Sequence, residues 1–357
     1  MTRGHRNPAR SRTRWLAAML AVLALLVAAC GSDSDDDAGG GTGGGGGGSG
    51  DCEPVASPDD ADDAEASGDA AASVEGLTLA STSSKAAAAR TTQGGAGGSV
   101  HFCWIPWDED IAATYLWKVL LEEQGYEVEM TQADVAPLFD SLAGGEFDVF
   151  LDGWLPTTHA DYWEQYQDDL TQVGVWYDQA VLTIAVPEYV DVDSLTELAD
   201  RADDFDNRIV GIEPGSGLMR VTEEAVIPTY CLEEFTLLEG STPSMLTELR
   251  AAIDNEENIV VTLWRPHWIY SQLDLKDLED PEGTLGEAEE IHVLANSEWA
   301  EANPEVIGWL ERFELTDEQL GTLEDLVLNE HEGDEEAGAK AWLEDPANRA
   351  IADAWFE

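Results

Sequence analysis

The chain has 357 residues, with 74 acidic side chains against 17 lysines and arginines, and its formal net charge is −57. So acidic a protein repels nucleic acids and anionic lipid surfaces, and both are therefore excluded as partners. Because counterions screen the repulsion between acids, the composition indicates a salt-loving or salt-stressed source.

The N-terminal segment 1–29 has the pattern of a signal peptide. Five arginines precede an apolar stretch over 15–27, which is short for a membrane-spanning helix. Small residues before Cys30 resemble a bacterial lipobox, so we expect a lipidated Cys30 that anchors the protein to the cell membrane, outside the cytoplasm. An ordinary secretory signal is the alternative. Residues 30–98 are rich in Gly, Ser, Ala and Asp, which cannot bury a core and predict a disordered tether.

Three further cysteines, Cys52, Cys103 and Cys231, are an odd number. An exported location permits a disulfide bond, for example between Cys103 and Cys231. Cys103 lies in an apolar strand, where a buried free thiol is equally consistent. The sequence leaves the pairing open.

From residue 99 onwards strands and helices alternate, which predicts an α/β fold with a mostly parallel sheet. The first unit comprises, in chain order, a strand over 100–105, a helix over 111–123, a strand over 127–131, a helix over 135–142 and a strand over 148–151. The second unit comprises a strand over 181–186, a helix over 194–202, a strand over 209–212, helices over 218–228 and 245–255 and a strand over 259–263. A strand over 291–295 and C-terminal helices follow, opened by a capping box at Thr316 and Gln319.

This order predicts two lobes with a hinged cleft between them. One lobe would comprise 99–182 and 290–357, and the other 183–289. The chain would cross between them near 183 and 289, and closure would be a hinge motion. We expect a monomer.

Three tryptophans, Trp107, Trp154 and Trp264, each close an apolar run that predicts a buried strand. Ligands of α/β proteins bind at strand ends. A single tryptophan after a strand usually covers a core, but three of them predict an aromatic box for a quaternary ammonium cation. Ring faces attract such a charge, which has no proton to donate.

A Gly-rich turn over 211–219 leads from a strand into a helix, whose first backbone N–H groups suit a carboxylate or a phosphate. The turn lacks the lysine of a nucleotide-binding loop. His159, five residues after Trp154, adds an imidazole. Indole faces for a cation and N–H groups for an anion together favour a zwitterion of the betaine type.

Several separated segments over 99–325 closely resemble the glycine betaine substrate-binding proteins of ABC transporters, including those that begin at Trp107, Trp154, Gly211 and Trp264. The resemblance implies a two-lobed periplasmic-binding-protein (Venus flytrap) fold and osmoprotective uptake through a permease and an ATPase subunit, without catalysis, cofactor or metal. It also implies a set of ligand-binding residues: the indoles of Trp107, Trp154 and Trp264 around the trimethylammonium group, with His159 and the amides of Gly217 and Leu218 on the carboxylate.

Other functions stay open at this point. Glu109, close to Trp107, keeps choline as an alternative ligand, and carnitine is another. The sequence does not decide whether Tyr177 or Trp268 also lines the site. An exported carbohydrate-active hydrolase would also use tryptophans and carboxylates, but 74 acids make any carboxylate pair uninformative. An osmosensor with the same box is a third possibility.

Overall fold

The computed structural model of the chain describes residues 97–357. The expected signal peptide, the lipidation of Cys30, the position of Cys52 and nearly all of the expected tether lie outside these residues. Within residues 97–357, none of the helices has both the length and the apolar character needed to cross a membrane.

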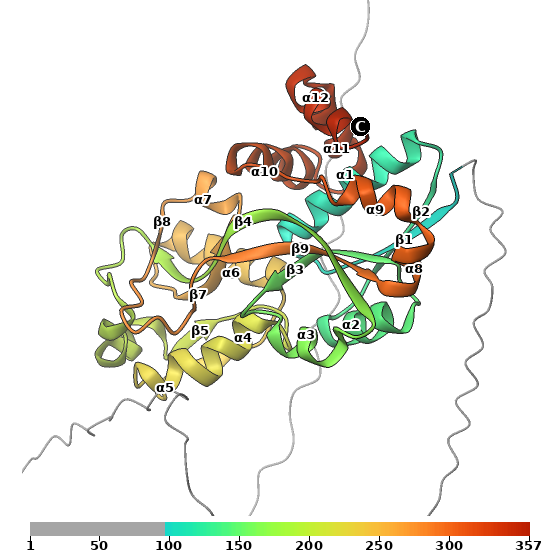
Figure 1. The fold of residues 1–357 in the computed structure, drawn as a ribbon. Helices are drawn as coiled ribbons and strands as arrows, with labels where there is room; N and C mark the ends of the chain where they lie inside the picture. Colours follow the sequence, from blue (N-terminus) through green and yellow to red (C-terminus); the bar gives the residue numbers. More distant parts are fainter. Residues whose placement is uncertain (1–96) are drawn as a thin grey trace, which may run out of the picture. The chain divides into compact units, whose positions relative to one another are not determined.

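The described residues form a nine-stranded mixed sheet with the strand order β2-β1-β3-β9-β4-β7-β5-β6, in which β8 pairs with β4 (Figure 1). The strands are β1 (Ser99–Trp104), β2 (Glu127–Gln132), β3 (Val149–Leu155), β4 (Leu170–Pro187), β5 (Arg208–Val210), β6 (Thr236–Leu238), β7 (Val261–Arg265), β8 (Leu275–Asp277) and β9 (Glu289–Asn296). The pairs β1–β2, β1–β3, β5–β6 and β5–β7 are parallel. The expectation of a mostly parallel sheet is wrong at the centre, because β4 and β9 run antiparallel to all their partners.

The strand β4 has 18 residues and joins the two halves of the sheet. Its first part, up to Ala180, pairs with β9, and its second part, from Val181, pairs with β7 and β8. The sequence predicts only the second part as a strand, over 181–186. The change of partner lies close to the expected crossing at 183, and β9 begins at Glu289, close to the other. The lobe boundaries themselves stay a prediction.

Helices flank the sheet: α1 (Asp108–Glu123), α2 (Val135–Gly144), α3 (Ala160–Tyr166), α4 (Gly217–Val221), α5 (Ile227–Thr229), α6 (Thr242–Asn255), α7 (Ile269–Gln272), α8 (Ser297–Ala302), α9 (Pro304–Leu310), α10 (Asp317–Glu324), α11 (Glu335–Glu344) and α12 (Pro346–Ala354). The helix expected over 194–202 is two 3-10 segments, Leu195–Glu197 and Ala199–Phe205. Wider π turns, Thr222–Val226 and Asp325–Glu330, continue α4 and α10. The capping box is confirmed, because Thr316 and Gln319 exchange both hydrogen bonds.

The first turn of α1 differs from the expectation in a way that matters for the site. The helix begins at Asp108, three residues early, and its N-cap is Trp107, whose side chain makes no capping bond. Asp108 and Asp110 are therefore helical residues of the first turn and do not cap the helix. Both acids are buried, and Asp110 accepts hydrogen bonds from the Ile105 amide at 2.7 Å and the Thr114 hydroxyl at 3.0 Å. Cys103 is a buried free thiol and is not bonded to Cys231.

Candidate ligand-binding site

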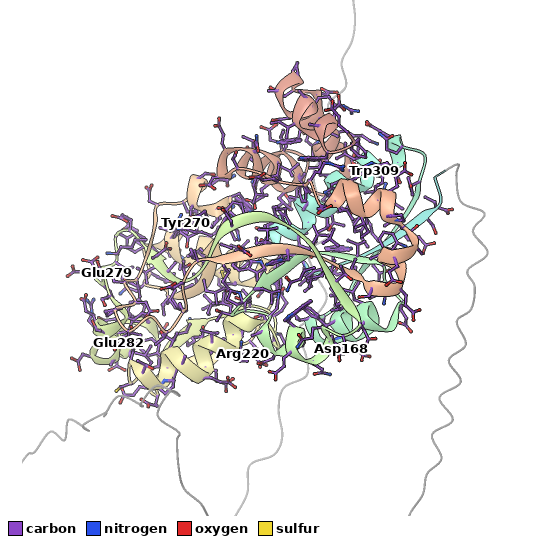
Figure 2. All side chains as sticks on the ribbon, viewed as in Figure 1. Asp168, Arg220, Tyr270, Glu279, Glu282 and Trp309 are labelled. Atoms are coloured by element: carbon purple, nitrogen blue, oxygen red, sulfur yellow. The ribbon has the colours of Figure 1, made fainter. Side chains whose placement is uncertain are left out.

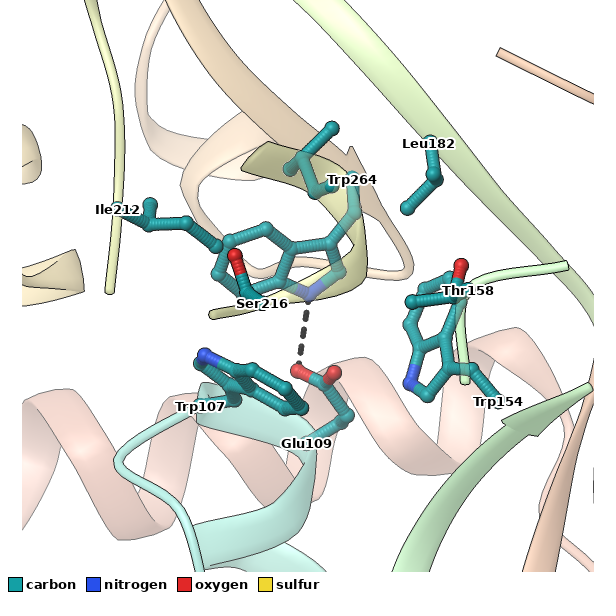
Figure 3. A pocket seen from close by; sticks show the side chains of 9 residues that line it. Trp107, Glu109, Trp154, Thr158, Leu182, Ile212, Ser216 and Trp264 are labelled. Carbon is teal, nitrogen blue, oxygen red and sulfur yellow. Dashed lines mark hydrogen bonds between the residues drawn. The ribbon is translucent and has the colours of Figure 1, made fainter. Parts of the chain in front are cut away.

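Three tryptophans from three different elements surround one small hollow (Figure 3). Trp107 comes from the start of α1, Trp154 from the end of β3 and Trp264 from β7, and each is at most 5% exposed. The hollow is lined by Trp107, Glu109, Trp154, Thr158, Leu182, Ile212, Ser216, Leu218 and Trp264.

The turn after β3 is held by buried side chains. Nδ1 of His159 accepts the backbone N–H of Trp154 at 3.0 Å. The carboxylate of Glu289, at the start of β9, accepts the N–H groups of Thr157 and Thr158 at 2.6 and 2.8 Å, and also the Thr158 hydroxyl. These bonds fix the direction in which the Trp154 indole leaves the strand.

His159 lies behind the hollow and not on its wall. Its ring is fully buried and stacks on Trp107, with centroids 5.7 Å apart and an interplanar angle of 12°. Burial, and then the positive charge of Arg220, lower the pKa of His159 to about 3, so the imidazole is neutral. Because Nδ1 accepts a hydrogen bond, Nε2 carries the proton. Within the described residues Nε2 has no acceptor, so its buried N–H makes no hydrogen bond.

The expected Gly-rich turn leads into α4 as predicted. The Ser216 hydroxyl caps the helix by accepting the N–H of Met219 at 3.4 Å, which leaves the first-turn amides of Gly217 and Leu218 without a partner inside the helix. A Cβ at position 217 would lie 2.0 Å from the backbone oxygen of Thr158, so only glycine permits this approach. Leu218 lines the hollow, and Gly217 lies beside the turn after β3.

The sequence does not decide whether Tyr177 and Trp268 line the site. In the structure, neither residue is on the wall of the hollow. The hydroxyl of Tyr177 donates to Asp317 at 3.0 Å, and Trp268 is buried next to His267. Both residues line a larger groove beside α10. The ring of His267 meets Trp264 edge-on at 4.8 Å, and its Nδ1 accepts the N–H of Ile269 at 3.2 Å, so it supports the turn after β7.

Each indole at or beside the hollow donates its N–H to a carboxylate, which the sequence analysis did not foresee. The pairs are Trp107 with Glu213 at 3.2 Å, Trp154 with Asp152 at 2.9 Å, Trp264 with Glu109 at 2.9 Å, and Trp268 with Asp108. Three of the four join α1 to the part of the chain that contains β5 and β7. An indole whose N–H is bonded in this way is held in one orientation, so the acids set the shape of the hollow.

The carboxyl groups around the indoles are crowded and almost inaccessible to water. Burial raises the pKa of Asp108 to about 7, and it raises those of Glu109, Asp110, Asp152 and Glu324 well above their usual values. The negative charges of neighbouring acids add to this effect. Over residues 97–357 no group of His, Cys, Asp and Glu side chains has the arrangement of a metal site.

Comparison with known proteins identifies the family. Residues 98–345 match the model of the substrate-binding domain of ABC-type glycine betaine transport systems. The chain belongs to this family. Its members are extracytoplasmic substrate-binding proteins of transporters, so the resemblance seen in the sequence is confirmed.

The solved structures most useful for comparison share this family's two-lobed fold. The glycine betaine, L-proline-binding protein ProX of Borrelia burgdorferi is 30% identical with a TM-score of 0.68. The match covers 72% of this chain and 96% of the ProX chain. Lactococcal OpuAC, in its closed conformation with glycine betaine, is 31% identical with a TM-score of 0.67. The match covers 72% of this chain and 99% of the OpuAC chain. The expected α/β two-lobed fold is therefore confirmed.

Among curated proteins, the glycine betaine/carnitine transport binding protein GbuC of Listeria monocytogenes is 34% identical over 147 residues. The match covers 40% of this chain and 48% of GbuC, so the chain spans about half the length of that relative. An uncharacterized protein of Chromohalobacter salexigens is 33% identical over 123 residues, which is 33% of this chain and 79% of that protein.

Proposed function

We propose that this family member is the extracytoplasmic receptor of an ABC importer that binds glycine betaine or a related betaine in a tryptophan box and delivers it to the permease for osmoprotection. One observation carries the proposal: the indoles of Trp107, Trp154 and Trp264 line a single compact hollow. A trimethylammonium group has no N–H to satisfy, and it gains by leaving water for aromatic faces.

The anionic end of a betaine would be held on the side of the hollow nearest α4. The donors proposed for it are the unpartnered Nε2–H of His159 and the first amides of α4, at Gly217 and Leu218. A carboxylate at a helix start is favoured by the aligned N–H groups there. Since Thr158 packs directly on Gly217, the turn after β3 and the start of α4 would close around the ligand together.

Location and role complete the proposal. We infer that Cys30 is the lipidated first residue of the mature protein, that the protein acts as a monomer with a permease and an ATPase subunit, and that it performs no catalysis. The lobes proposed for the hinge motion are 99–182 with 290–357, and 183–289. Choline and carnitine are the alternative ligands, because both carry the same trimethylammonium group.

The test is calorimetric titration of the purified full-length protein with glycine betaine, carnitine and choline, with tryptophan emission recorded in parallel. We expect saturable binding with a change of emission, and tighter binding of ligands that carry a carboxylate. Absence of heat with all three compounds would refute the proposal. Tighter binding of choline than of glycine betaine would keep the aromatic box and reject the anionic subsite.

A further inference from the structure

Glu109 differs from the other carboxylates that accept an indole N–H, because it also forms part of the wall of the hollow (Figure 3). Its Oε2 accepts the N–H of Trp264 at 2.9 Å, and the residue is 1% exposed. Asp108, Asp152 and Glu213 hold their indoles from behind the wall. An aromatic box therefore contains one carboxylate that a ligand can meet.

We propose that the Glu109 carboxylate is the counter-ion of the bound cation, and that it determines the specificity of the hollow for a permanent positive charge over a neutral group of the same shape. This inference rests on the proposed function. Indole faces attract the charge through cation–π interactions, but the burial energy that they supply does not depend on charge, because a methylated carbon centre buries the same apolar area as a methylated nitrogen. A buried carboxylate discriminates strongly, since the interaction of two charges is far larger in a water-poor cavity than in water.

Among residues 97–357, no basic group acts on the charge of the Glu109 carboxylate. The ionisable groups that act on Glu109 are all acids: Asp108 and Asp110 of α1, Asp152 of β3 and Glu324 of α10. Beyond them, His267 after β7 and Glu213 after β5 lie next to Asp108. His267 is neutral, because burial lowers its pKa to about 3. The others are acids, so a cation entering the hollow relieves the repulsion among them.

This arrangement couples ligand binding to protons. Burial, followed by the charge of Asp152, raises the pKa of Glu109, so the empty site retains protons that the unfolded chain would lose. A cation next to the carboxylate favours its charged form and displaces a proton to solvent. Binding of an onium ligand should therefore release protons and should strengthen as the pH rises through the range in which the empty site titrates.

The experiment compares ligands that differ only in charge. The full-length protein is titrated with glycine betaine and with tert-butylacetate, in which carbon replaces the quaternary nitrogen, in buffers of different ionisation enthalpy. We expect the wild type to prefer glycine betaine and to release protons with it but not with tert-butylacetate. Glu109→Gln keeps an acceptor for the Trp264 N–H but removes the charge. It should therefore weaken the binding of glycine betaine at least about tenfold and leave the binding of tert-butylacetate unchanged or improved.

Asp152→Asn is the matched control, because Asp152 also holds an indole N–H but lies off the wall. It should reduce the preference for the cation less than Glu109→Gln does. Equal weakening of both ligands by Glu109→Gln would overturn the inference, since it would show that Glu109 only orients Trp264. Binding of glycine betaine by the wild type without proton release would also overturn it, whether or not the variant folds. A wild type that binds no onium compound would refute the proposed function itself.

Discussion

Arg220 lies on α4 (Figure 2), and the Nε atom of its guanidinium is 3.2 Å from the carboxylate of Asp161 on α3. The same group donates from Nη2 to the backbone oxygen of Thr157 at 3.1 Å. Nearby, the hydroxyl of Tyr162 donates to the backbone oxygen of Gly215 at 3.0 Å. These bonds connect the turn after β3 and α3 with the turn before α4 and α4 itself, and both turns contribute residues to the wall of the hollow.

Replacement of Arg220 should therefore favour an open arrangement of the cleft. The side chain is about one-third exposed, so its ion pair is screened, and the hydrogen bond to Thr157 adds a modest amount. We expect Arg220→Ala to weaken ligand binding about threefold to thirtyfold. Solution scattering of the unliganded variant should report a larger radius of gyration.

Arg201→Ala is the control for this prediction. Arg201 forms an ion pair of similar exposure with Asp204, three residues away on the same short segment. This ion pair does not join the turns on the wall of the hollow. Its loss removes a charge only, so ligand affinity and the radius of gyration should stay at wild-type values. Equal behaviour of the two variants would show that Arg220 has no part in closure.

Trp154→Ala tests the box directly. The indole is 3% exposed and lines the hollow. Its loss should lower the unfolding free energy by about 3–5 kcal/mol. It should also weaken the binding of glycine betaine at least about tenfold. Trp154→Phe keeps an aromatic face and loses the N–H bond to Asp152, so it should bind with intermediate affinity. Trp309→Ala, on α9 and away from the hollow, should bind normally. Normal binding by Trp154→Ala would show that the ligand binds elsewhere.

The sequence was sufficient to place the tryptophans at strand ends and the Gly-rich turn before α4, because apolar runs and glycines are local signals. It was not sufficient to pair Glu109 with Trp264, which are 155 residues apart, since one acid among 74 carries no distinguishing pattern. The first part of β4 was also missed. Its pairing with β9 shifts register three times, which breaks the alternation by which a strand is recognised.

Asp108 should make the stability of the protein depend on pH. Burial raises its pKa from 3.8 to about 7, so the folded state takes up a proton that the unfolded state does not between pH 7 and pH 4. Stability from this group is therefore present at low pH and is lost as the pH rises through 7. Asp108→Asn keeps an acceptor for Trp268 and removes the charge.

We expect Asp108→Asn to have a higher unfolding free energy than the wild type at pH 8, by on the order of a few kcal/mol, and this difference to be clearly smaller at pH 5, since it disappears only near pH 4. Thermal unfolding at both pH values measures this. Glu314→Gln removes one exposed charge before α10 and controls for the net charge of the chain. A constant difference between Asp108→Asn and the wild type at the two pH values would contradict a protonated Asp108 in the fold.

His159 should contribute a pH dependence of the opposite sign. Burial lowers its folded-state pKa from 6.5 to about 3, so between these values the unfolded chain binds a proton that the folded protein does not. Stability is fully present above pH 6.5 and decreases as the pH falls. His159→Gln should therefore show a smaller loss of unfolding free energy between pH 7 and pH 4, measured by denaturant titration.

The same variant tests the proposed carboxylate donor. Gln retains an N–H, whereas His159→Ala leaves the buried N–H of Trp154 without its acceptor and provides no donor to the ligand. We expect His159→Ala to weaken the binding of glycine betaine about tenfold more than the binding of choline, which has no carboxylate. His159→Gln should restore part of the preference for glycine betaine over choline. Because the imidazole is neutral from pH 5 to pH 8, its donor is constant in this range. Equal weakening of both ligands would assign His159 a purely structural role beneath Trp107.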